Sequence, residues 1–152
     1  MTLSRRAAAI QLGAAILVTT GLAPIAAESH RGVAAGGAVT ITVHYKGQGT
    51  VDSQHKLWIW VFDTPNIGPA AMPVREESLA ASGGSVLVDG LTEDRVWIAV
   101  GYDERGGSTG NAPPAPGSPI SIYSTGGGAP TGVATVDRTE AIVTFDDSLR
   151  MP

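Results

Sequence analysis

The sequence predicts an all-β fold, a single small sandwich of about seven antiparallel strands that follows an N-terminal signal peptide. Three observations predict it. Short segments alternate apolar and polar residues with a period of two, as half-buried strands do. Clusters of Gly, Pro, Asn and Asp separate these segments and mark turns. No stretch beyond residue 37 keeps the periodicity of an amphipathic helix.

The N-terminus has the three-part layout of a secretory signal. Arg5 and Arg6 form a short basic region, and a largely apolar run follows over residues 7–27. Small residues at its end predict cleavage after Ala27, so the mature chain is expected to begin at Glu28. The cleaved protein would then be free of the membrane, in the periplasm or outside the cell. An uncleaved membrane anchor is the competing interpretation, because about 20 apolar residues span a bilayer. Glycines, threonines and a proline lower the hydrophobicity of the run and favour cleavage.

The composition excludes several classes of protein. The chain has no cysteine, so disulfides cannot stabilise it and its core must do so alone. Ten Lys and Arg, two of them in the signal, stand against fourteen Asp and Glu, which gives the mature chain a net charge of −6. Because an acidic surface without a basic stripe repels phosphate, we expect no nucleic-acid partner.

The mature chain is predicted to hold a flexible leader over residues 28–37 and one sandwich domain over residues 38–152. The charges of the third strand make it an edge strand, and the fourth and fifth strands are expected to form a hairpin. A long Gly- and Pro-rich loop over residues 104–130 is interrupted only by the short sixth strand. The strands are expected at residues 38–46, 56–63, 72–79, 85–89, 95–103, 120–123, 132–136 and 140–146.

The middle of the mature chain resembles a known kind of module. Residues 83–91 have the sequence Gly-Gly-Ser-Val-Leu-Val-Asp-Gly-Leu, and residues 96–100 have Val-Trp-Ile-Ala-Val. This succession is similar to the carboxypeptidase-regulatory-like, transthyretin-type β-sandwich modules of exported proteins, although residues 92–95 replace the Pro-Pro-Gly turn of that family. The resemblance implies a transthyretin-like sandwich, with an immunoglobulin-like one as the alternative. It also implies a non-catalytic accessory or binding module, and such modules share no single ligand.

Residues 56–63 differ from the other segments because both faces of the expected strand are apolar. One face carries Leu57, Ile59 and Val61, and the other carries Trp58, Trp60 and Phe62. The aromatic side chains project from one side at intervals of about 7 Å. Trp97 joins this row if its strand is a neighbour.

The aromatic row is the candidate ligand-binding site of the chain. Flat aromatic rows hold sugar rings on many sandwich modules, so a carbohydrate or another protein is the predicted partner. A second interpretation is that the row belongs to the core beneath a covering loop such as residues 112–123. A third is that it is hidden in the interface of a homodimer. No cofactor is expected in any of these cases.

No catalytic or metal-binding constellation is predicted. Residues 106–110 match the Gly-x-Ser-x-Gly nucleophile elbow, but the elbow needs a helix next and the prolines at 113, 114 and 116 prevent one. The three histidines lack the spacing of a zinc site. Asp103 and the pair Asp146 and Asp147 supply too few clustered oxygens for calcium. The sequence therefore predicts a non-enzymatic binding or accessory module.

Overall fold

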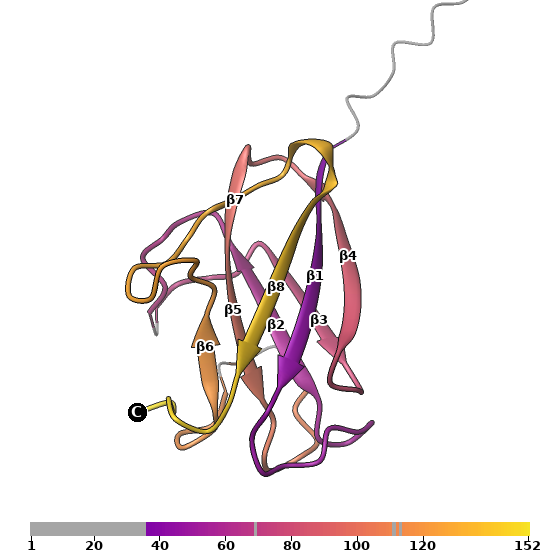
Figure 1. Cartoon of the computed structure of the whole chain (residues 1–152), viewed down its shortest axis with the longest axis vertical. Coiled ribbons are helices and arrows are strands. Elements are labelled where there is room, and N and C mark those ends of the chain that lie inside the picture. The colour runs from indigo at the N-terminus through magenta and orange to yellow at the C-terminus, as the bar shows by residue number, and fades with distance from the viewer. Residues whose placement is uncertain (1–35, 69, 111, 113) are drawn as a thin grey trace, which may run out of the picture. The chain divides into compact units, whose positions relative to one another are not determined.

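The computed structural model describes residues 36–152 apart from 69, 111 and 113, which form two β-sheets packed face to face (Figure 1). The predicted all-β sandwich is therefore confirmed. A 3-10 turn, η1 (Val136–Arg138), lies between the last two strands. The strands are β1 (Gly37–Tyr45), β2 (Leu57–Phe62), β3 (Arg75–Leu79), β4 (Gly84–Leu91), β5 (Arg95–Tyr102), β6 (Ile120–Ile122), β7 (Val133–Ala134) and β8 (Thr139–Phe145).

The predicted signal peptide, residues 1–27, and the predicted leader up to residue 35 lie outside the described residues. The last leader residue, Gly37, is the first residue of β1, so the strand begins one residue earlier than expected. Within the described part of the chain, no helix has the length and apolar character needed to cross a membrane.

The first sheet has the order β4-β1-β8, with β1 in the middle. β1 pairs antiparallel with β4 but parallel with β8, so the expectation that all strands are antiparallel is wrong. The cause is the turn before β8. The Ala38 N–H donates a hydrogen bond of 2.7 Å to the Thr135 carbonyl, so the chain reaches β8 beside the start of β1 and then runs in the same direction.

The second sheet has the order β3-β2-β5-β6, and β7 pairs with the beginning of β5. β3 lies at the edge of this sheet, as the sequence predicted. Its charged residues Arg75, Glu76 and Glu77 discourage pairing with another chain along that edge. β2 lies between β3 and β5, and its sequence is apolar throughout because both of its faces are buried.

β4 and β5 do not form the expected hairpin. β4 pairs with β1 in the first sheet, whereas β5 pairs with β2 in the second. The connection over residues 92–94 therefore crosses from one sheet to the other. The two strands still share one core, because Val88 on β4 and Val96 on β5 are both buried in it. A turn signal gives the position of a chain reversal, but it does not give the sheet that the next strand joins.

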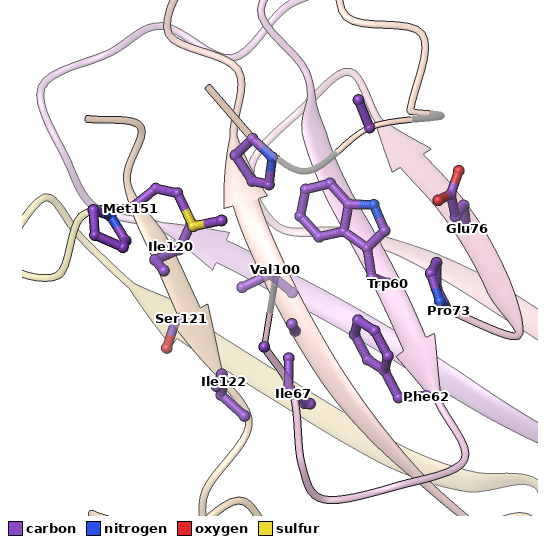
Figure 2. Close-up of a pocket in the computed structure, with 15 residues that line it drawn as sticks. Trp60, Phe62, Ile67, Pro73, Glu76, Val100, Ile120, Ser121, Ile122 and Met151 are labelled. Carbon is purple, nitrogen blue, oxygen red and sulfur yellow. The ribbon is translucent and has the colours of Figure 1, made fainter. Parts of the chain in front are cut away.

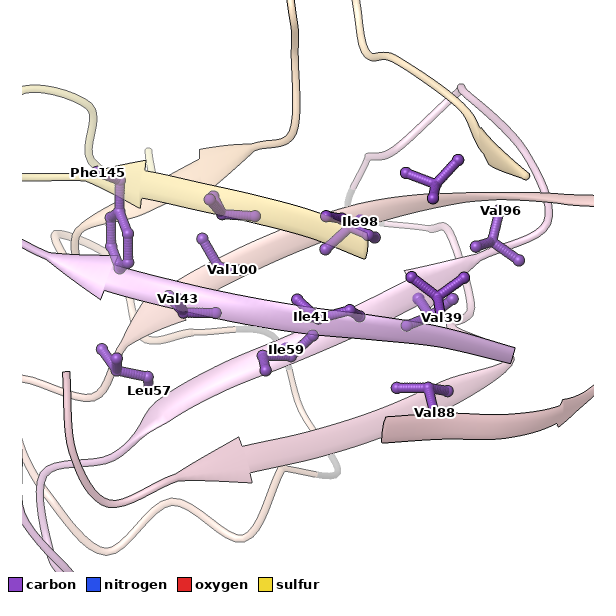
Figure 3. Close-up of a cluster of buried hydrophobic side chains, with 14 of the residues drawn as sticks. Val39, Ile41, Val43, Leu57, Ile59, Val88, Val96, Ile98, Val100 and Phe145 are labelled. Atoms are coloured by element: carbon purple, nitrogen blue, oxygen red, sulfur yellow. The ribbon is translucent and has the colours of Figure 1, made fainter. Parts of the chain in front are cut away.

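The core lies between the two sheets and consists of the inward residues of both (Figure 3). Every second residue of β1, β2 and β5 points into it, as the period of two predicted. The residues concerned are at most 1% exposed: Val39, Ile41, Val43, Leu57, Ile59, Val61, Val96, Ile98 and Val100. On β8, Ala141, Val143 and Phe145 close the core on the side of the first sheet.

Candidate functional site

The aromatic row of β2 lies on the outer face of the second sheet, and it is buried there. Trp58, Trp60 and Phe62 are 9%, 6% and 6% exposed. They form a second apolar cluster, separate from the main core, with Ile67, Ala71 and Ala99 packed against it. The row is thus packed as a small outer core, which agrees with the second interpretation, and it does not form an open platform of exposed rings.

Small residues on β5 make room for these rings. Ala99 lies opposite Trp60 in the strand register, and Gly101 lies opposite Trp58. A Cβ atom added at Gly101 would lie 3.1 Å from Cζ3 of Trp60 and 3.1 Å from Cγ of Pro114. The Trp60 ring therefore leans over β5, and both the ring and the overlying chain approach the backbone of that strand.

A covering loop, residues 103–119, lies over the aromatic row. Gly110 is so close to Trp58 that an added Cβ would lie 2.2 Å from the ring carbon Cζ3. Pro114 reaches Gly101 in the same way. The N–H of Met151 donates to the carbonyl of Ser118, so the end of the chain also lies beside this loop. The row is thereby covered by segments that precede and follow β6.

A pocket of about 290 Å³ remains between the aromatic row and β6. In Figure 2, Trp60 and Phe62 lie on one side of β5, and Ile120 and Ile122 lie on the other. The floor between them is Ala99, whose register partners are Trp60 on β2 and Ile122 on β6. Ile67, Pro114 and Met151 are among the other apolar residues that line the pocket. Carbon therefore surrounds most of the pocket.

Two polar residues line the pocket. Glu76 lies opposite Trp60 on the edge strand β3, and Ser121 lies between the two isoleucines of β6. A buried polar or charged ligand group needs hydrogen-bond partners, because desolvation without them is costly. The carboxylate of Glu76 can accept hydrogen bonds or pair with a cation, so the pocket is apolar with one acidic position at its side.

Trp58 and Trp97 lie outside the lining of this pocket. The ammonium of Lys56 is 5.9 Å from the centre of the Trp58 ring, within reach of a cation–π interaction. Among the described residues, no acceptor is within hydrogen-bond distance of Trp58 Nε1, although this atom is buried. Trp97 pairs with Phe62 in register but is only half-buried, beside Gly132. The structure thus brings Trp60 and Phe62 to the pocket and leaves the other two predicted residues beside it.

The Gly-x-Ser-x-Gly segment forms a turn on the surface. Ser108 is exposed, its N–H donates to Asp103 Oδ2 at 2.8 Å, and its hydroxyl accepts a hydrogen bond from the Gly110 N–H at 3.3 Å. His55 Nδ1 lies 3.2 Å from Asp52 Oδ1 within a separate turn. None of the hydrogen bonds among the described residues joins Ser108 to His55. Residues 106–110 therefore form a surface turn without a base hydrogen-bonded to the serine.

The carboxylates considered for calcium accept hydrogen bonds within their own turns. Asp103 accepts from the backbone N–H groups of residues 106 and 108, and Asp146 accepts from that of Ser148. Asp147 accepts from the Tyr45 hydroxyl and from the Gln48 N–H, and these bonds hold the pKa of Asp147 below its usual value. In the part of the chain that the structure describes, no three His, Cys, Asp or Glu side chains are placed to hold a metal ion.

Sequence reasoning missed the far wall and the floor of the pocket. The period of two in β5 places Trp97, Ala99 and Gly101 on the outer face, and the two small residues are a signal of space beside the aromatic row. Met151 carried no such signal, because its place depends on pairing near the end of the chain.

Comparisons of the chain with protein-family models, curated proteins and solved structures find no match.

Proposed function

We propose that this protein is an exported, non-enzymatic binding module of the transthyretin-like kind, and that it binds a small amphipathic ligand in the pocket of the second sheet. The observation that carries the proposal is the apolar pocket of about 290 Å³ between Trp60 and Phe62 on one side and Ile120 and Ile122 on the other. Ligand pockets are typically such apolar concavities with a few polar groups that fix orientation.

The size of the pocket suits one ring with a short chain. A cavity of about 150 Å³ holds a benzene molecule, and this pocket is about twice as large. It lies at the lower end of the usual range of ligand pockets, roughly 300–1,000 Å³. The ligand we propose therefore has an aromatic ring or a branched aliphatic group as its body.

The lining favours such a ligand over a sugar. A pyranose carries several hydroxyl groups, and each loses its hydrogen bonds to water on entering a site. Glu76 and Ser121 are the polar residues of the lining, and the Ser121 side chain points to the opposite face of β6 from Ile120 and Ile122. A cationic group at one end of the ligand would instead meet the Glu76 carboxylate while the ring fills the apolar part. We therefore propose an aralkyl amine as the ligand class and keep the carbohydrate as the alternative.

The test is a titration followed by chemical-shift changes in the ¹⁵N-labelled protein. Phenethylamine should shift the resonances of β2, β5 and β6, and phenethyl alcohol should bind more weakly because it lacks the charge. Glu76→Gln should remove the preference for the amine. Ala99→Leu should abolish binding of both probes, because the larger side chain fills the floor of the pocket.

The matched control is Ala80→Leu, the same change at an exposed position away from the pocket. It should leave binding unchanged, and the unfolding midpoints of both variants show that they are folded. Absence of shifts with either aromatic probe contradicts the proposal. Shifts on the same strands with a soluble oligosaccharide instead would support the carbohydrate alternative.

A further inference from the structure

β8 is the sheet edge in this structure that carries the least protection against pairing with another chain. Among the described strands, β3 has charged residues at its edge and β6 has only three residues. β4 has glycine near each end, and Gly90 there has a φ of +65°. β8 has seven residues without Gly, Pro or Lys, and its parallel register with β1 is unbroken. Long regular edges of this kind pair with other strands.

The backbone groups at the free edge of β8 can be assigned. The Phe145 carbonyl accepts a hydrogen bond from the Lys46 N–H at 2.8 Å, so the backbone of Phe145 faces the chain of β1. Along a strand, these groups alternate in direction from one residue to the next. The N–H and carbonyl groups of Glu140, Ile142 and Thr144 therefore point to the free edge.

We propose that β8 pairs antiparallel with β8 of a second copy of this chain, with Ile142 at the two-fold axis. In this register Ile142 faces Ile142 of the other copy, and Glu140 faces Thr144. The N–H and carbonyl groups of Glu140, Ile142 and Thr144 point outward, so the two residues of each facing pair can exchange two backbone hydrogen bonds. The two first sheets then join into one continuous sheet across the axis.

Charge favours this register over its neighbour. With Ile142 at the axis, the carboxylate of Glu140 lies opposite the hydroxyl of Thr144, and both residues are exposed. With Val143 at the axis, Glu140 would lie opposite Asp146 instead, and two like charges would face each other. The register with Ile142 at the axis thus avoids a like-charge pair that the register with Val143 at the axis would create.

The side chain at the axis also suits this contact. Ile142 is 59% exposed, more than Leu87 at 41%, the other large aliphatic residue on an outer face that also carries Glu140 and threonines at 40, 42 and 144. Figure 1 shows β8 at the margin of its sheet, with β1 on one side. Pairing across the axis would cover Ile142 with the same residue of the second copy.

Sedimentation velocity over a range of concentrations of the purified protein tests the proposal. The wild type should follow a monomer–dimer equilibrium, and Ile142→Lys should weaken it by about tenfold or more, because two like charges then meet at the axis. Leu87→Lys is the matched control. Leu87 is 41% exposed on β4, in the same sheet but away from β8, so this variant should dimerise like the wild type.

A charge exchange tests the register. Thr144→Glu should weaken the dimer by about threefold to tenfold, because two carboxylates then face each other across the axis, and adding Glu140→Lys should recover the wild-type affinity. A wild type that stays monomeric at every soluble concentration overturns the proposal. So does a dimer that keeps its affinity in Ile142→Lys, or a double variant that is no better than Thr144→Glu alone. Unfolding midpoints confirm that each variant is folded.

Discussion

Gly110 is the residue at which the covering loop touches the aromatic row. It has a φ of +86°, and an added Cβ would lie 2.2 Å from Trp58. Gly107 in the same loop has a φ of +80° with no atom within 4 Å of an added Cβ. The two positions share the left-handed backbone conformation, which costs an L-residue about 1–2 kcal/mol, and differ only in the contact.

Alanine substitutions at these glycines should therefore give different losses of stability. Gly107→Ala should lower the free energy of unfolding by about 1 kcal/mol, through backbone conformation alone. Gly110→Ala should lower it by about 3 kcal/mol, because overpacking against the Trp58 ring is added. Urea unfolding measures both. Equal losses would mean that the loop does not press on the ring in solution.

Tyr45 and Asp147 form the residue-scale interaction that depends most on pH. The Tyr45 hydroxyl donates to the Asp147 carboxylate, and burial together with this carboxylate raises the pKa of Tyr45. The hydrogen bonds from Tyr45 and Gln48 lower the pKa of Asp147 from its ordinary value of 3.8. A lowered carboxyl pKa in the folded state stabilises the fold above the ordinary pKa, and this contribution is lost as the pH falls through the lowered value.

Tyr45→Phe should therefore destabilise the protein at neutral pH and not in acid. We expect a loss of about 1–2 kcal/mol in the free energy of unfolding at pH 7, as for a hydrogen bond to a charged group that is partly exposed. The difference from the wild type should shrink as the pH falls below 3.8, because Asp147 then becomes protonated in both proteins. Unfolding in urea over a pH series measures this, and a difference independent of pH would contradict the role of Asp147.

At the scale of elements, β2 connects the two apolar clusters of the protein. Its inner residues belong to the main core, and its outer residues form the small core beneath the covering loop. Trp60→Ala should lower the free energy of unfolding by about 3–5 kcal/mol, as truncations of buried aromatic residues do. Trp97→Ala on β5 should cost less, because Trp97 is only half-buried on the same face. Guanidinium unfolding measures both variants, and a fully stable Trp60→Ala would mean that the outer cluster does not support the fold.

The positions of these elements could be predicted from sequence, and their partners could not. Val39, Ile41 and Val43 alternate with polar residues, and this local pattern is enough to give a strand and its buried face. The same holds for β2, where two apolar faces indicate cover on both sides. Pairing is non-local: Val39 meets Thr139, a residue 100 positions later, and no local pattern specifies that register or its parallel direction.

The pocket could not be predicted from the sequence for the same reason. Trp60 and Phe62 stand out in the sequence because aromatic residues alternate there with aliphatic ones. Ile122 and Met151 become their neighbours only through the pairing of β6 with β5 and of the chain end with the covering loop. Single residues were therefore visible as candidates, whereas the enclosed space between them is a property of the tertiary structure.

At the scale of the whole molecule, the proposed export predicts a defined N-terminus. The chain recovered from the medium or periplasm of an expressing cell should begin at Glu28 or within one or two residues of it, because the small residues before it suit signal peptidase. Intact-mass spectrometry measures this directly. Recovery of the chain in membranes with Met1 or residue 2 as its first residue would support the anchor instead.

The parallel pairing of β1 and β8 has a mechanical consequence. The chain enters the sandwich at the start of β1, and the segment after β8 continues from the opposite end of this strand pair, where residues 149–151 pair with residues 117–120. A tension applied through the segments before β1 and after β8 would pull the two strands along their axes in opposite senses. The backbone ladder between the strands runs from the pair Val39–Thr139 to the pair Tyr45–Phe145. Its hydrogen bonds would then bear the load together in shear, rather than open one after another. Rupture would require the loss of most of this ladder at once, which raises the barrier that governs forced unfolding.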